Sequence, residues 1–144
     1  MKSRAILLAF VFALLASCST QNTSPIIGTW QLVNGKAVTS DTTFTYPGNN
    51  GNHWKIITKS HFATIYQDTT SNTILSTGFN GGTYSYIDGI YTESFSHSSI
   101  SNRQIGTSMY FKAKVNGDKL FISPCLEDGT EKESGNFEEY KRLD

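Results

Sequence analysis

The chain has 144 residues, and its 12 basic and 12 acidic side chains give no formal net charge. This length suits a single domain able to bury a real hydrophobic core. The balanced charge excludes the strong positive field with which proteins concentrate nucleic acid, so we expect no nucleic-acid partner.

The first segment combines two basic residues with a short apolar run. Lys2 and Arg4 precede the run from Ile6 to Leu15, which ends in Leu15-Ala16-Ser17-Cys18. A basic start, a short apolar run and small residues before the cleavage point define a secretory signal, and the run is too short to span a bilayer. The segment resembles a bacterial lipoprotein signal peptide. An ordinary signal peptide with an incidental cysteine is the alternative.

This resemblance implies a signal peptide over residues 1–17 and a lipid on Cys18. Residues 18–25 would then be the lipidated cysteine and a short polar tether. Loss of Lys2 and Arg4 leaves the mature chain slightly acidic, and Cys125 becomes its one remaining thiol, without a disulfide partner. The resemblance implies a lipid anchor in the bacterial outer membrane. Ser19 and Thr20, with no acidic run after them, favour the face towards the periplasm.

Residues 26–144 have the pattern of an antiparallel β domain. Short runs of alternating apolar and polar residues are broken by Gly, Asn and Asp, and no window of eleven residues carries a helical stripe. We predict an all-β fold of about eight to ten strands. No nucleotide-binding loop, nucleophile elbow or compact metal-ligand motif is present in the sequence.

The sequence Ile87-Asp88-Gly89-Ile90 predicts a β-hairpin with a two-residue type I′ turn. Counting outward from this turn pairs Tyr86 with Tyr91, Tyr84 with Glu93 and Gly82 with Phe95. The opposite face carries small hydroxylated residues that suit contact with water, so the aromatic face is predicted to be the inner one. That face comprises Tyr84, Tyr86, Tyr91, Glu93, Phe95 and His97.

A second hairpin is predicted at Asn116-Gly117, which would pair Ala113 with Leu120 and Phe111 with Ile122. Its inner face is apolar and forms ordinary core wall.

His61 lies on a predicted strand whose inward face the alternation does not identify. If His61 faced inwards, it could join His97 and Glu93 as metal ligands or as an acid–base pair. No activated nucleophile is visible, however. We therefore expect no metal, no cofactor and no catalytic residues, and we do not expect an enzyme.

The two ends of the domain suggest how the sheet is arranged. If the strands around residues 27–32 and 137–143 are neighbours, the sheet closes on itself and loses its exposed edges. A sandwich of two sheets is the alternative.

Several motifs in order resemble the lipocalin-like lipoproteins of Bacteroidetes. They are Gly28-Thr29-Trp30, Lys55-Ile56-Ile57-Thr58 before His61-Phe62, Gly81-Gly82-Thr83-Tyr84, Tyr91-Thr92-Glu93 and the closing Tyr140-Lys141-Arg142. The resemblance implies an up-and-down β-barrel of the lipocalin-like (calycin) type over residues 26–144. It also implies that Gly28 and Trp30 form a structural signature, with Trp30 at the closed end covered by Arg142 or Lys141.

An eight-stranded barrel is just wide enough to be filled by side chains or to hold one small ligand. We predict that the aromatic face lines a site for a small, partly aromatic or hydrophobic molecule. In one alternative these tyrosines simply fill the interior and hydrogen-bond Glu93. In another, the chain is an interaction or inhibitor module that binds an envelope protein through loops around residues 46–52 and 68–80.

Overall fold

The computed structural model describes residues 24–46, 52–70 and 73–144. The predicted signal peptide, Cys18 and most of the tether therefore lie outside the described residues. Nothing helical in the described part is long and apolar enough to cross a membrane. The described elements are β1 (Gly28–Val38), β2 (Thr43–Tyr46), β3 (Asn52–Ile57), β4 (His61–Thr70), β5 (Thr73–Ile87), β6 (Ile90–Ser98), the 3₁₀ helix η1 (Asn102–Gln104), β7 (Ser108–Asn116), β8 (Lys119–Pro124) and β9 (Gly135–Arg142).

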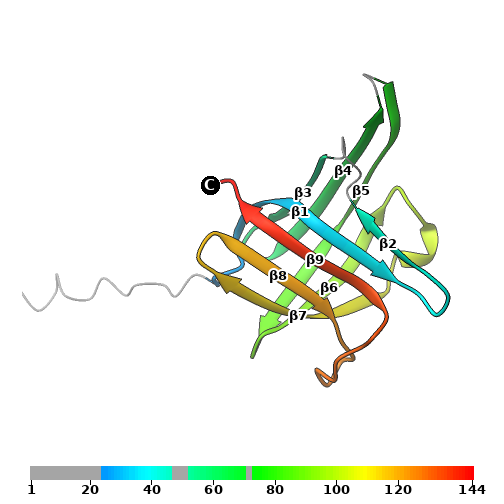
Figure 1. The fold of residues 1–144 in the computed structure, drawn as a ribbon. Helices are drawn as coiled ribbons and strands as arrows, with labels where there is room; N and C mark the ends of the chain where they lie inside the picture. The colour runs from blue at the N-terminus through cyan, green and yellow to red at the C-terminus, as the bar shows by residue number, and fades with distance from the viewer. Residues whose placement is uncertain (1–23, 47–51, 71–72) are drawn as a thin grey trace, which may run out of the picture.

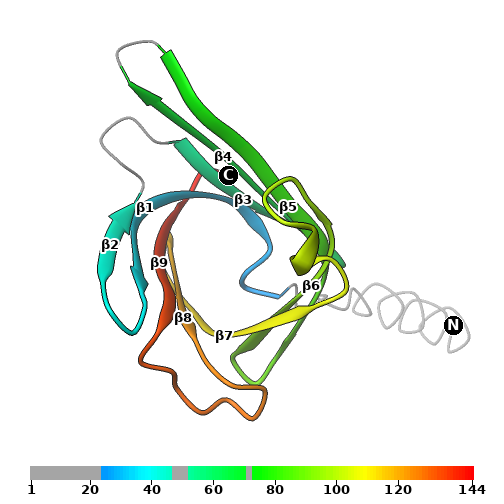
Figure 2. The same cartoon turned by 90° about the vertical axis from the view of Figure 1, so that its right-hand side faces the viewer.

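The strands form one antiparallel sheet that closes into a barrel (Figure 1, Figure 2). Their order is β2-β1-β3-β4-β5-β6-β7-β8-β9, and β9 pairs again with β1. The first half of β1 pairs with β3 and the second half with the short strand β2, so β2 extends the wall beside β3. The predicted all-β antiparallel barrel is confirmed, and the sandwich is excluded.

The hairpin between β5 and β6 has the predicted register. Asp88 and Gly89 have φ values of 51° and 83°, as a type I′ turn requires at both central positions. Tyr86 pairs with Tyr91, Tyr84 with Glu93 and Gly82 with Phe95.

In the hairpin between β7 and β8, the pairing of the strands is shifted by two residues from the predicted register. Asn116 pairs with Lys119, so the turn consists of Gly117 and Asp118, and Ala113 pairs with Ile122. Gly117, with φ of 62°, takes the first central position that a type II′ turn reserves for glycine. Because the shift is two residues, the predicted apolar face still points inwards.

One end of the barrel is closed around Trp30, which is fully buried. Its indole Nε1 donates a hydrogen bond to the Ile26 carbonyl at 2.8 Å. The Arg142 guanidinium lies 4.0 Å from the centre of the Trp30 ring and donates hydrogen bonds to the carbonyls of Ile27 and Pro25. Arg142, rather than Lys141, therefore makes the contact that the resemblance implied.

Gly28 allows this close approach. Its φ is 150°, and a Cβ atom at this position would overlap the Arg142 guanidinium. The Gly-x-Trp motif is thus explained by space as well as by backbone conformation.

The described core lies inside the ring of strands. Its members are Ile26, Trp30, Leu32, Ile57, Phe62, Tyr91, Phe95, Phe111, Ala113, Leu120, Ile122 and Tyr140.

The predicted loop at residues 68–80 is wrong, because β4 continues to Thr70 and β5 begins at Thr73. The two strands form a long hairpin that projects beyond the rest of the barrel (Figure 1, Figure 2). The threonines and the isoleucine of this stretch are β-branched, and such residues favour the extended conformation.

Replacing Arg142 by Met should lower the free energy of unfolding by about 2–4 kcal/mol, since it removes a cation–π contact and two charged hydrogen bonds. Urea denaturation would measure this loss. Lys141→Met, an exposed change on the same strand, is the matched control and should stay within about 0.5 kcal/mol of the unchanged chain. Equal effects of the two substitutions would show that the Trp30 contact contributes nothing.

Candidate functional site

Three charged side chains meet inside the barrel. Lys55 from β3 lies 2.8 Å from a carboxylate oxygen of Glu93 on β6 and 3.6 Å from one of Glu138 on β9. Lys55 and Glu93 are only 3% and 4% exposed. We refer to Lys55, Glu93 and Glu138 as the lumen cluster, the lumen being the inside of the barrel. Charges buried this deeply persist only when they are paired.

Tyrosines complete the contacts of the lumen cluster. Tyr140 donates a hydrogen bond of 2.6 Å to one oxygen of Glu138, and Tyr46 donates one of 3.0 Å to the other. The Lys55 ammonium also lies 5.3 Å, 5.5 Å and 5.9 Å from the ring centres of Tyr140, Tyr91 and Phe111. Its positive charge is therefore held by both carboxylates and aromatic faces.

Burial opposes the charge on Lys55, but the two glutamates outweigh it. Desolvation would lower the pKa of Lys55, whereas the nearby carboxylates of Glu93 and Glu138 raise it, and the net shift is upwards. Lys55 is thus a protonated ammonium at neutral pH, and it acts as a fixed positive charge in the lumen.

Two polar atoms in the lumen lack a hydrogen-bond partner among the described residues. One is the hydroxyl oxygen of Tyr91, a fully buried residue, and the other is the side-chain oxygen of Asn80. Burial, and then the nearby Glu93 carboxylate, raise the pKa of Tyr91, so its phenol stays protonated. Buried polar atoms without partners are rare in native proteins. Such atoms often mark a place where a bound water, ion or ligand supplies the missing hydrogen bond.

Five of the six predicted site residues lie on the inner face. Tyr91, Glu93 and Phe95 are buried, and Phe95 packs edge-on against Phe62 at 5.4 Å. Tyr84 and Tyr86 lie towards the closed end. There Tyr84 donates a hydrogen bond to the carbonyl of Thr58, and Tyr86 donates one to the carbonyl of Ala113. Their assignment to a ligand site remains a prediction.

His97 does not follow the predicted alternation. Between Gly82–Phe95 and Gly81–His97 the register shifts, so Ser96 is an extra residue in β6. A bulge of this kind interrupts the alternation of side chains. His97 is exposed and its Nδ1 lies 2.9 Å from the Ser96 hydroxyl. Its predicted inward position is therefore wrong.

The histidine and glutamate residues considered as metal ligands are not brought together. His61 is exposed, whereas Phe62 beside it is buried, so the strand turns its other face inwards. Within residues 24–46, 52–70 and 73–144, no group of three or more His, Cys, Asp or Glu side chains could hold a metal ion.

Sequence reasoning missed Lys55 and Glu138. Both could have been found by counting in twos along their strands. Lys55 shares a face with buried Ile57, and Glu138 shares a face with Tyr140 and with Arg142, which was already expected to cover Trp30. Glu138 lies at the end of a strongly acidic stretch, residues 127–139, and such stretches favour contact with solvent. This composition conceals the inward position of Glu138.

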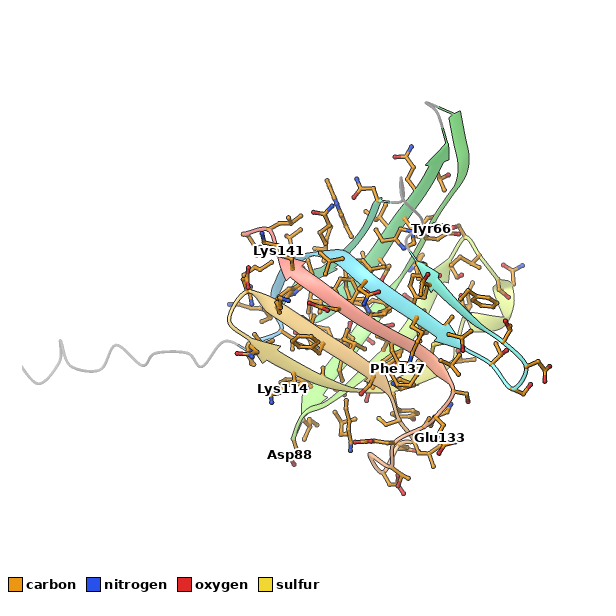
Figure 3. The ribbon with its side chains drawn as sticks, in the orientation of Figure 1. Tyr66, Asp88, Lys114, Glu133, Phe137 and Lys141 are labelled. Carbon is orange, nitrogen blue, oxygen red and sulfur yellow. The ribbon has the colours of Figure 1, made fainter. Side chains whose placement is uncertain are left out.

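The open end of the barrel carries a second group of aromatic rings. The His53 ring stacks with Tyr46, with ring centres 6.2 Å apart, and lies 5.5 Å from Tyr66. Tyr66 lies on β4, near the end of the barrel opposite Lys141 (Figure 3). We call Tyr46, His53 and Tyr66 the aromatic row. Side chains at Gly35 or Gly78 would overlap Tyr46 or Tyr66, so glycine makes room for both rings.

A cavity of about 350 Å³ lies at the same end, where β7 begins and β8 ends. Its walls include Met109, Phe111 and Pro124, together with Gly135 and Asn136 at the start of β9. Phe111 also borders the lumen cluster, because its ring is 5.9 Å from the Lys55 ammonium. Phe111 therefore belongs both to the wall of the cavity and to the surroundings of the Lys55 ammonium.

No family model and no curated protein matches this chain. Among solved structures, the chain is similar to a lipocalin-like protein from Bacteroides uniformis, with 16% sequence identity and a TM-score of 0.49. The alignment covers 81% of this chain and 97% of that chain.

Lys55→Met should destabilise the protein by about 3–5 kcal/mol, because it leaves Glu93 buried without its partner. The double variant Lys55→Met, Glu93→Leu should recover most of this loss in a urea titration. Lys112→Met is the matched control: Lys112 has the same 2.8 Å contact with a glutamate, but at the surface. It should cost no more than about 1 kcal/mol. A similar loss in both single variants would contradict the importance of burial.

Proposed function

We propose that this chain is a lipid-anchored lipoprotein of the cell envelope whose barrel binds one small, partly aromatic or hydrophobic molecule. The observation that carries the proposal is the fully buried Tyr91 hydroxyl, which lies beside the Glu93 carboxylate and accepts no hydrogen bond from the described residues, inside an aromatic lumen. The cavity of about 350 Å³ at the open end supports it, since ligand pockets span about 300–1,000 Å³.

The proposed site is built from two layers. Tyr91, Glu93 and Phe95 form its inner wall, with Tyr84 and Tyr86 closing it towards Trp30. The aromatic row and the cavity lie at the open end, through which a molecule would enter. His97 is left out of the proposed site because of the bulge.

Binding rather than catalysis suits these positions. His61 and His97, the two histidines first considered as acid–base groups, are exposed and contact the hydroxyls of adjacent serines. Neither reaches Glu93 in the lumen. The lumen offers fixed charges and aromatic surfaces, which recognise a molecule without transforming it.

The proposed anchor is compatible with an accessible site. The described chain enters at the closed end, where Ile26 and Ile27 contact Trp30 and Arg142. Lys114 and Lys141 lie at the same end (Figure 3). An outer-membrane anchor on Cys18 would place this end next to the lipid bilayer. We propose that the barrel lies on the periplasmic side of that membrane. The open end would then point away from the membrane.

The neutral fluorescent probe N-phenyl-1-naphthylamine should bind the protein and brighten, because the aromatic walls of the lumen exclude water. Met109→Trp should weaken this binding by about tenfold or more, since Met109 lines the cavity. Ile87→Trp, an equally large change at a 66% exposed position, should leave it unchanged. Native mass spectrometry of the protein from its own host would then identify the natural molecule. Absence of probe binding to the folded chain would refute the lumen site.

Cys18→Ser should abolish lipid attachment and release the protein from the membrane fraction, because the thiol that accepts the lipid is lost. Mass spectrometry of the N-terminal peptide, with membrane fractionation, would measure both effects. Cys125→Ser is the control and should remain anchored. If the two variants fractionate alike, Cys18 does not carry a lipid anchor.

An alternative function is binding of an envelope protein, and one surface feature favours it. Trp54, Ile65 and Phe79 lie side by side across β3, β4 and β5, and each is more than 40% exposed. Such a row of apolar residues is typical of interaction surfaces. A partner whose binding is lost in Trp54→Gln but kept in Met109→Trp would support this alternative.

A further inference from the structure

We propose that the lumen recognises an organic cation: a small molecule with a primary ammonium group on an apolar or aromatic body. This inference rests on the proposed function, because it names the chemical class of the lumen ligand. It follows from the charges, the hydrogen bonds and the aromatic surfaces of the open half of the barrel.

The first argument is the charge balance of the lumen cluster. It contains two carboxyl groups, Glu93 and Glu138, and one ammonium, Lys55. With all three ionised, the cluster has one net negative charge. In the described part of the chain, Lys55 is the one cation paired with these two carboxylates. An uncompensated charge in a protein interior is costly, and a ligand with a positive charge would offset it.

The second argument is the balance of donors and acceptors. Lys55 donates to Glu93, and both Tyr46 and Tyr140 donate to Glu138. The lumen atoms without partners are the Tyr91 hydroxyl and the Asn80 side-chain oxygen. The Asn80 oxygen can only accept a hydrogen bond, and the phenol oxygen can accept one too. A ligand with N–H donors can therefore satisfy both oxygens, and a primary ammonium brings three.

The third argument is the aromatic row. Tyr46 links it directly to the lumen cluster, because its hydroxyl is bonded to Glu138 while its ring stacks with His53. His53 shares a face with Lys55, and Tyr66 shares a face with buried Phe62, so these rings belong to the inner wall. Aromatic faces attract cations. Lys55 already uses three rings of this lumen in that way.

These features together favour a cation over an anion or a neutral apolar molecule. Inside the lumen cluster an anionic ligand would meet one more carboxylate than ammonium, because Lys55 is already paired with Glu93. Lys132 lines the cavity at the open end but is not part of this cluster. A neutral apolar ligand would leave the Asn80 oxygen and the Tyr91 hydroxyl unsatisfied, at a cost that buried polar groups normally avoid. A cation satisfies the charge, the acceptors and the rings at once.

Three size-matched probes test the inference: 2-phenylethylamine, 2-phenylethanol and phenylacetate, which are a cation, a neutral molecule and an anion near pH 7. Each is titrated calorimetrically into the full chain in phosphatidylcholine nanodiscs, with empty nanodiscs as the blank. The amine should bind at least about tenfold more tightly than the alcohol, and the acid should bind most weakly.

Glu138→Gln is the decisive variant, because it removes the excess charge and keeps Lys55 with Glu93. It should weaken binding of the amine by about tenfold and leave the alcohol unchanged. Glu139→Gln, the next residue on β9, is the matched control, since Glu139 pairs with Lys119 outside the lumen. Should Glu138→Gln fail to fold, Tyr66→Leu provides a second test, with a selective loss of amine binding expected.

The outcomes separate this inference from the proposed function. Equal binding of amine and alcohol, or tightest binding of the acid, would overturn the inference while the neutral fluorescent probe still reports a lumen site. Amine binding that Glu138→Gln and Tyr66→Leu both leave intact would overturn it as well. If neither the amine nor the fluorescent probe binds, both proposals fail.

Discussion

The pairing of β1 with β9 is the constraint on which the rest of the structure depends. It joins residues 30–38 to residues 135–142, so that a strand near the start of the domain lies beside the last one. This contact converts an open sheet into a ring and gives every strand in it an inner and an outer face. The register of this pairing shifts between Leu32 and Asn34, so β1 has one extra residue there. The extra residue lets the strand bend around the barrel.

Closure gives the two ends of the barrel different chemistry. At one end Ile26, Trp30 and Arg142 form a plug whose polar atoms are hydrogen-bonded. At the other end glycines leave room for tyrosine rings, and an unpaired asparagine oxygen faces the interior. The contacts at the first end stabilise the fold. The second end contains a group to which a bound molecule could donate a hydrogen bond.

The lumen cluster lies between these ends, and stability alone does not explain it. Replacing a buried ion pair as a unit by apolar residues is often neutral or stabilising, whereas breaking it is costly. An apolar interior would therefore have served folding equally well. We therefore propose that the combination of Lys55, Glu93 and Glu138 with aromatic faces serves recognition of a ligand, and this proposal connects the fold to the proposed function.

Local patterns in the sequence were sufficient wherever a single turn controls the structure. The Asp88-Gly89 turn determined the pairing of Tyr84 with Glu93, because both turn residues need a positive φ. The same counting failed at His97, since a bulge adds one residue without a clear local signal. At Gly82 a Cβ atom would overlap the Ser94 carbonyl, so glycine is required where the strands approach closely. A glycine within a strand is a signal for such a bulge, but it does not say where the extra residue lies.

The sequence by itself determined the antiparallel β class and the aromatic inner face of β5 and β6. The contact of Trp30 with a basic residue of the last strand was implied by the resemblance to lipocalin-like proteins and not by the residue pattern. Alternation along a strand reveals which residues share a face, and turn residues reveal how neighbouring strands pair. Only the tertiary structure decided that Lys55, Glu93 and Glu138 meet. They come from three strands that are not neighbours in the sheet, and they meet because closure curves the sheet until its inner faces oppose each other. No local pattern encodes a contact across the barrel, since that contact depends on the closure and curvature of the whole sheet.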